Sequence, residues 1–96
     1  MSKQKEGKLR FDLIPPEADK ALAEVLSMGA QKYGDRDWET GIDVYDLLAA
    51  KKRHINKWEL GQTFDDESGL HHFKHALINL AMMVALEERK KPYEGN

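Results

Sequence analysis

The most informative part of this sequence is residues 70–89, LHHFKHALINLAMMVALEER. A rotation of about 100° per residue gives a helix here apolar side chains on two opposite faces. The first face consists of Leu70, Phe73, Leu77, Leu80, Ala81 and Val84. The second face carries Met82, Met83 and Leu86 in its C-terminal half. Because a helix that is apolar on both sides is expected to be buried, we predict that it lies between its own subunit and a partner.

The N-terminal half of the second face is polar. It carries His72, His75 and Asn79 within a band about 60° wide. Histidines at positions i and i+3 can reach one metal ion, phosphate or carboxylate. An unsatisfied buried polar group would cost about 1–3 kcal/mol. Two interpretations stay open: a ligand site, or histidines that bond to carboxylates or backbone at a helix interface.

Two further helices are predicted before this segment. Proline suits the first turn of a helix but not its interior, so Pro15 or Pro16 begins a helix that ends near Gly34. A second helix runs from about Val44 to Leu60 and is followed by Gly61. The apolar residues recur at helical spacing, as Ala18, Ala21, Leu22, Val25 and Leu26 in the first helix and Val44, Leu47, Leu48, Ile55 and Trp58 in the second.

The length of 96 residues predicts one domain, residues 1–96, with an N-terminal arm at 1–12 and a frayed tail at 90–96. The fold class is all-α, a small bundle of three to four helices. A chain this short buries only roughly 60–65% of its unfolded surface. We therefore expect a homo-oligomer, because small helical bundles often complete their core by association.

Composition excludes several classes of function. The chain has no cysteine, which excludes a disulfide scaffold, a cysteine zinc site and a thiol nucleophile. The net charge of −2 gives no general attraction to long nucleic acid. The charged start, residues 1–10, resembles no signal peptide, and no segment has the roughly 20 apolar residues that span a bilayer. We expect a cytoplasmic protein without a membrane partner.

An acidic segment lies directly before the histidine-rich helix. Asp65, Asp66 and Glu67 lie within one or two turns of His72. Carboxylates with imidazole form a ligand set that suits Mg²⁺ or Mn²⁺. The alternative is helix capping, in which Asp66 or Ser68 accepts the first backbone N–H groups of the helix.

His54 and Arg53 lie on the preceding helix, and His54 borders its apolar stripe. A single histidine there is typical of a satisfied core or interface residue. It becomes part of a site if its helix packs against the band of His72 and His75, because facing helices commonly hold metals and cofactors.

Basic and aromatic residues nearer the N-terminus are candidates for nucleotide contacts. Ammonium and guanidinium groups neutralise phosphate, and aromatic rings stack on bases. The alternatives are solvated charges and core anchors. The candidates are Lys8, Arg10, Lys32, Arg36, Tyr33 and Trp38. No P-loop, dinucleotide-binding glycine pattern or nucleophile elbow is present.

Three segments resemble a known family: GKLRFDLIPPE at 7–17, KYGDRDWETG at 32–41 and DDESGLHHFKHA at 65–76. They closely resemble the phage dATP/dGTP diphosphohydrolases, also called MazZ, which look like a compact branch of the MazG-like all-α NTP pyrophosphatases. The resemblance extends from about residue 7 to residue 88. It implies a helical-bundle dimer or tetramer that uses Mg²⁺ or Mn²⁺ to cleave a purine deoxynucleoside triphosphate into monophosphate and pyrophosphate.

The resemblance also suggests residue roles. Catalytic roles fall to His54, Glu67, His72 and His75. Substrate contacts fall to Lys8, Arg10, Lys32, Tyr33, Arg36, Trp38, Arg53 and Asn79, and Asp12 belongs to the same first block. Candidate metal ligands are Glu39, Asp65, Asp66, Glu67 and His72. The wider superfamily uses ExxE and ExxD runs on consecutive helices, and helix 44–60 carries no such run.

The predicted chemistry is therefore metal-assisted attack of water on a phosphorus atom of the triphosphate. Two rival hypotheses remain at this stage. One is a non-catalytic interaction protein that binds through Met82, Met83 and Leu86, since methionine-rich faces are adaptable. The other is a nucleotide-binding domain without hydrolysis.

Overall fold

The computed structural model describes residues 7–94, and it describes side chains as far as residue 90. In chain order the elements are η2 (Phe11–Leu13), α1 (Pro16–Tyr33), η3 (Asp37–Glu39), α2 (Val44–Glu59) and α3 (His72–Glu94). Within the described residues the only β-type pairing is an isolated bridge between Phe64 and His71. The predicted all-α class with three main helices is confirmed.

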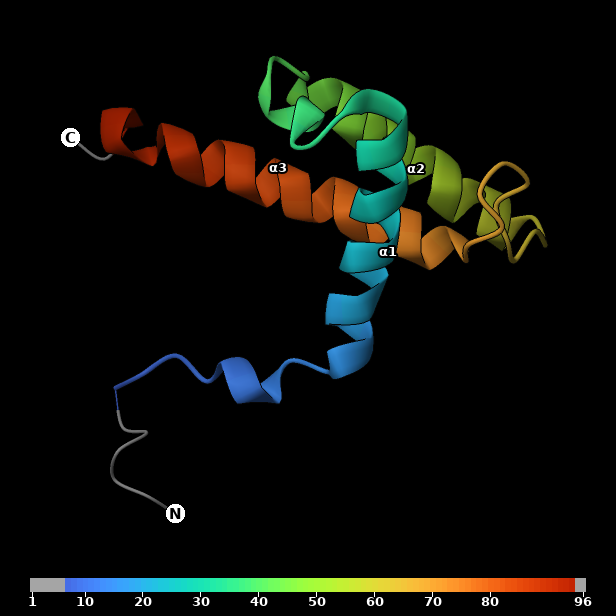
Figure 1. Ribbon diagram of the computed structural model, residues 1–96, viewed down its shortest axis with the longest axis horizontal. Helices are drawn as coiled ribbons and strands as arrows, with labels where there is room; N and C mark the ends of the chain where they lie inside the picture. Colours follow the sequence, from blue (N-terminus) through green and yellow to red (C-terminus); the bar gives the residue numbers. More distant parts are fainter. Residues whose placement is uncertain (1–6, 95–96) are drawn as a thin grey trace.

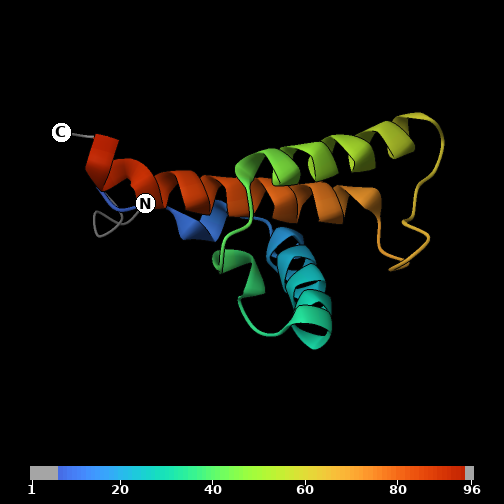
Figure 2. The same cartoon turned by 90° about the horizontal axis from the view of Figure 1, so that it is seen from above.

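Helices α2 and α3 form an antiparallel hairpin, and α1 crosses α3 at a steep angle (Figure 1). The view from above shows α2 running alongside α3, with the linker 60–71 joining them at one end (Figure 2). Helix α3 thus contacts both other helices, which gives the polar band of α3 neighbours from two sides. No described helix is both long enough and apolar enough to cross a membrane.

The first two helices begin and end as their local sequence predicts. Pro15 precedes α1, and Gly34 ends it with φ of 98°. The Asp43 carboxylate accepts the Tyr45 N–H at 2.8 Å, which caps α2. After α2, Gly61 at φ of 107° turns the chain into the linker, a backbone geometry that favours glycine.

Helix α3 begins two residues later than predicted, at His72, and neither Asp66 nor Ser68 caps it. The first-turn N–H of Phe73 instead donates to Nδ1 of His71 at 2.9 Å. The reason lies in the linker, whose polar groups are used internally. The backbone N–H of Ser68 donates to the Asp65 carboxylate, and Leu70 N–H donates to the Ser68 hydroxyl.

At its other end, α3 continues to Glu94, beyond the predicted end at Arg89. Residues 90–94 of the predicted frayed tail are therefore helical, and residues 95–96 lie outside the described residues. Adding residues to an existing helix avoids the cost of nucleation, so a long packed helix extends readily past its last core contact.

The apolar core is small. Its buried apolar side chains among the described residues are those of Ala21, Leu47, Ala76 and Ile78. The face of α3 that packs inward is the one with the polar band. The face expected to be apolar and buried, from Phe73 to Val84, stays exposed, with Val84 at 60%. This outward face, Phe73, Leu77, Leu80 and Val84, is here called the α3 outer stripe.

Candidate functional site

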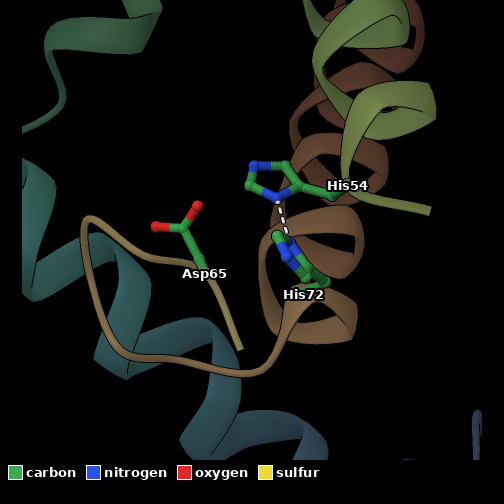
Figure 3. A group of neighbouring side chains, drawn as sticks. All are labelled: His54, Asp65 and His72. Atoms are coloured by element: carbon green, nitrogen blue, oxygen red, sulfur yellow. Dashed lines mark hydrogen bonds between the residues drawn. The ribbon is translucent and has the colours of Figure 1, made fainter. Parts of the chain in front are cut away.

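Three side chains from separate elements converge where α2, α3 and the linker meet. His54 comes from α2, Asp65 from the linker and His72 from α3, and one donor atom of each lies within 4.8 Å of the others. Figure 3 shows the Asp65 carboxylate beside the two imidazole rings. This cluster is the one group in the described part of the chain that offers such a donor set from histidine, aspartate or glutamate.

His72 lies at the centre of a hydrogen-bonded chain. Its side chain is fully buried, with 0% exposure. Its Nδ1 lies 2.8 Å from Nδ1 of His54, and its Nε2 lies 2.6 Å from Oε1 of Gln62. Both ring nitrogens therefore have partners, as a buried imidazole requires.

His75 extends the cluster by one helical turn. Its ring stacks on that of His54, with centroids 4.6 Å apart and 9° between the planes. Its Nε2 lies 2.6 Å from the Ser68 hydroxyl and 3.9 Å from Oδ2 of Asp65. The linker turn thus presents one hydroxyl and one carboxylate to the second histidine of the band.

The environment keeps His54 and His75 neutral near pH 7. Burial, together with the neighbouring His75, lowers the pKa of His54 from its ordinary 6.5 to about 4. Burial also lowers the pKa of His75, although the Asp65 carboxylate opposes this effect. A neutral imidazole keeps a lone pair, so both residues can bind a metal ion at neutral pH.

Asp65 remains a carboxylate. Burial acts to raise its pKa, but hydrogen bonds from the backbone and side chain of Ser68, with the nearby His75, hold the pKa of Asp65 below its usual value. A partly buried anion next to neutral imidazoles is a site that favours a cation.

A cavity of about 440 Å³ opens beside the cluster. Its lining includes the polar side chains of His54, His75 and Asn79 and the aromatic side chains of Tyr33 and Trp38. Most of the other lining is apolar and comes from α1, α2 and α3. The volume lies within the range of about 300–1,000 Å³ that is usual for small-molecule sites.

A second cavity of about 340 Å³ adjoins the other side of His75. It is lined by Lys32, Glu67, Asp65 and Ser68, among others. Nζ of Lys32 lies 3.9 Å from the Glu67 carboxylate. The cavity of about 440 Å³ is here called the apolar cavity, and the one of about 340 Å³, with Lys32 and Glu67, the charged cavity. Because His75 and Tyr33 line both, the two cavities meet at the histidine cluster.

The structure brings many of the predicted site residues to these two cavities and their shared wall. They are His54, Asp65, His72 and His75 in the cluster, Lys32 and Glu67 in the charged cavity, and Tyr33, Arg36, Trp38 and Asn79 in the apolar cavity.

Other predicted residues lie elsewhere. Arg53 is exposed and lines a separate depression on α2 with Lys51 and Lys52. Asp66 is exposed and is not one of the three donors that converge. Neither residue is brought to the cluster by the described fold.

Glu39 also stands apart from the cluster. Its Oε2 lies 3.5 Å from Nη1 of Arg36 and 3.2 Å from Nη1 of Arg89. The Arg89 guanidinium in turn lies 5.1 Å from the centre of the Trp38 ring. Glu39 is therefore placed to hold the η3 loop against α3, beside the aromatic end of the apolar cavity.

The N-terminal arm carries its predicted residues away from the helices (Figure 1). Arg10 forms two hydrogen bonds to the Asp12 carboxylate, at 2.8 and 2.7 Å. Lys8 is exposed on the same arm. In a single chain these cations do not reach either cavity.

Two residues of this arrangement, Gln62 and Arg89, are not predicted from the sequence. Gln62 follows the predicted end of a helix, where a polar residue is unremarkable, and Arg89 lies in a run of charges. Neither has a local signal, because each acquires its partner, His72 or Trp38, only through packing.

The donor set of the cluster fits a divalent cation. Two imidazole nitrogens and one carboxylate oxygen suit Mn²⁺ and related ions, whereas Mg²⁺ prefers oxygen donors. The 2.8 Å between the two Nδ1 atoms is close to the roughly 3 Å expected for adjacent ligands of an octahedral ion at bond lengths of about 2.1 Å. His54, Asp65 and His72 are therefore the residues that could hold an ion.

Comparison with known proteins identifies the family of this chain. A dATP/dGTP diphosphohydrolase from Salmonella phage PMBT28 is 42% identical over 81 residues, which cover 84% of this chain. The chain spans only 28% of the length of that relative. No solved structure matches significantly. The family model described as dATP/dGTP diphosphohydrolase, N-terminal, matches residues 1–95, and the chain belongs to this family.

Proposed function

We propose that this chain carries the site of a metal-dependent pyrophosphohydrolase that converts a purine deoxynucleoside triphosphate into monophosphate and pyrophosphate. One water molecule is consumed, and the P–O bond between the α-phosphorus and the bridging oxygen is broken. The observation that carries the proposal is the convergence of His54, Asp65 and His72. His54 lines the apolar cavity, Asp65 lines the charged cavity, and His72 is fully buried. The relative named as a dATP/dGTP diphosphohydrolase supports it.

In this proposal His54, Asp65 and His72 hold a divalent ion, Mn²⁺ or Mg²⁺. The ion would supply positive charge to the triphosphate and lower the pKa of a water molecule. The two nitrogen donors favour Mn²⁺ of the two. The protein contributes the fixed position of the donors, which come from two helices and a tightly hydrogen-bonded linker.

The charged cavity would receive the phosphates. Lys32 offers an ammonium group there, and its weak pairing with exposed Glu67 leaves it available to an anion. Neutral His75 is the group best placed to accept a proton, because the Asp65 carboxylate 3.9 Å away stabilises the imidazolium that would form.

The apolar cavity would receive the base. Trp38 and Tyr33 supply aromatic surface, and half-buried Asn79 supplies an amide that can both donate and accept hydrogen bonds. This region is large enough for a purine ring. The methionine face of the rival interaction hypothesis is less available, since Met82 lines the same cavity.

The remaining parts of the proposal concern the assembly and its setting. We expect a homo-oligomer, dimer or tetramer, because the α3 outer stripe is exposed in one chain. An enzyme of nucleotide metabolism would act in the cytoplasm, which for a phage protein is that of the infected host. Neither a membrane nor long nucleic acid is needed as a partner.

The proposal is tested by product analysis with two neighbouring aspartates. Purified protein is incubated with dATP or dGTP and Mn²⁺ or Mg²⁺, and monophosphate, diphosphate and pyrophosphate are resolved. We expect monophosphate plus pyrophosphate, a reaction that EDTA abolishes. Asp65→Asn should lower the rate by roughly 100-fold or more, as loss of a metal ligand does. Asp66→Asn, which changes a residue outside the cluster, should leave the rate near that of the wild type.

Two results would contradict the proposal. One is the absence of turnover and of any nucleotide-induced thermal shift in the wild type. The other is an equal effect of the Asp65→Asn and Asp66→Asn substitutions, which would show that the cluster has no special part in the reaction.

A further inference from the structure

Gln62 lies outside every motif discussed so far, yet its side chain contacts the most deeply buried polar group of the chain. Its Oε1 lies 2.6 Å from Nε2 of His72, whose exposure is 0%. A hydrogen bond that short at a fully buried ring decides where the ring keeps its hydrogen. The hydrogen bond between Gln62 and His72 therefore bears on which tautomer His72 adopts.

A carbonyl oxygen can only accept a hydrogen bond, so Nε2 of His72 must donate. A neutral imidazole has one N–H group. Nδ1 of His72 is therefore a lone pair. Nδ1 of His54, 2.8 Å away, must then carry the hydrogen between the two rings in the metal-free protein.

The backbone holds Gln62 in place for this contact. Its N–H donates to the Lys57 carbonyl at 2.9 Å, and the N–H of Gly61 donates to the Trp58 carbonyl at 3.0 Å. These two bonds close the end of α2 in a Schellman motif, with Gly61 in a positive-φ conformation. One residue further on, the Thr63 carbonyl accepts the N–H of His72 at 3.1 Å. The helix ending of α2 is thereby tied to the beginning of α3.

We propose that Gln62 is a positioning residue of the cluster: its amide oxygen keeps the hydrogen of His72 on Nε2 and leaves the Nδ1 lone pair directed at His54. Partners behind a metal-binding histidine commonly set its tautomer and orientation in this way. The tautomer assignment stands on the protein alone. Its consequence for metal affinity rests on the proposed function.

The direct test is NMR of the histidine side chains in metal-free, ¹⁵N-labelled protein near pH 7.5. Long-range ¹H–¹⁵N correlations distinguish the two tautomers, and His54→Gln and His72→Gln assign the rings. We expect Nε2–H on His72 and Nδ1–H on His54 in the wild type. A wild-type His72 with its hydrogen on Nδ1 would overturn the proposal, whatever the variants do.

Substitutions at Gln62 give the second measurement. Gln62→Leu removes the acceptor and should abolish the Nε2–H preference of His72, whereas Gln62→Glu keeps an acceptor and should retain it. Binding of Mn²⁺ alone, without nucleotide, should weaken about 10- to 100-fold in Gln62→Leu. Gln31→Leu, at an exposed glutamine on α1, is the matched control and should change neither property.

The possible outcomes separate the two claims. An unchanged His72 spectrum and unchanged Mn²⁺ affinity in Gln62→Leu would overturn the role of Gln62. A wild type with the expected tautomers but without Mn²⁺ binding would support the role of Gln62 and contradict the proposed metal function. If Gln62→Leu does not fold, the wild-type spectrum alone still decides the tautomer.

Discussion

His54, on α2, is half-buried against α3, where its Nδ1 contacts that of His72 and its ring stacks on that of His75. Burial and the neighbouring His75 make protonation of His54 unfavourable, and they leave a neutral ring that can bind a cation. Its pKa of about 4 in the folded chain, against 6.5 for an ordinary histidine, links this site to the stability of the fold.

The pH dependence of stability follows from this difference. Between pH 6.5 and 4 the unfolded chain protonates His54 while the folded chain does not, so protons favour unfolding. The stabilising contribution is complete above about pH 6.5 and is lost as the pH falls toward 4. The lowered pKa of His75 acts in the same direction. Asp65 acts only at lower pH, because its pKa lies below 3.8.

Urea unfolding of the metal-free protein, measured at intervals from pH 8 to pH 5, checks this expectation. The free energy of unfolding should decrease below pH 6.5, and His54→Gln should make the curve flatter in that range. Equal slopes for the wild type and His54→Gln would show that His54 is not the group responsible.

At the scale of secondary-structure elements, the short η3 turn depends on a distant part of α3. Arg89 lies over one face of Trp38 and is held by the Glu39 carboxylate. Trp38 lines the apolar cavity, whereas Arg89 does not line it. Arg89 and Glu39 therefore support Trp38 without lining the cavity of the proposed base.

Loss of this support should weaken nucleotide binding modestly. A cation–π contact contributes about 0.5–1 kcal/mol at exposed sites, which corresponds to about a 2- to 5-fold change in affinity. Arg89→Leu should weaken dGTP binding by this amount, while Lys90→Leu, at the neighbouring exposed cation, should not.

Tryptophan fluorescence measures the effect. The chain has two tryptophans, so Trp58→Phe leaves Trp38 as the only reporter. In this background dGTP should change the emission, and inorganic tripolyphosphate, which has no base, should change it little. An emission that responds equally to both ligands would contradict base stacking on Trp38.

At the scale of the whole molecule, the single chain is more open than a compact domain of its length. Its radius of gyration is 15.9 Å, against about 12.5 Å expected for 96 residues. The α3 outer stripe lies on the side of α3 away from the cavities, and Leu77 and Leu80 are 37% and 42% exposed. Such a surface is typical of a subunit interface.

We expect the purified protein to be a homo-oligomer that depends on this stripe. Leu80→Glu places a charge in the apolar face and should shift sedimentation velocity toward the monomer. Ala49→Glu, at an exposed site on α2, should leave the assembly unchanged. A wild type that sediments as a monomer at micromolar concentration would contradict the prediction.

The helices and most of the residue types of the site can be predicted from local sequence patterns. Proline at the start of α1 and glycine after α1 and α2 act locally, through φ angles and missing N–H groups, so their effects can be read without a fold. The spacing of His72, His75 and Asn79 also follows from helix geometry alone.

Tertiary structure decided which of these residues meet. Whether α2 would place His54 against His72, and whether Asp65 or Asp66 would face them, depends on the linker turn and its hydrogen bonds. The beginning of α3 at His72 and the exposure of the α3 outer stripe also depend on how the segments pack, which the sequence pattern does not show. Glu39 contacts Arg89, a residue far away in the chain, and Gln62 contacts His72 across the linker turn. Both contacts arise from tertiary packing, which residue spacing does not encode.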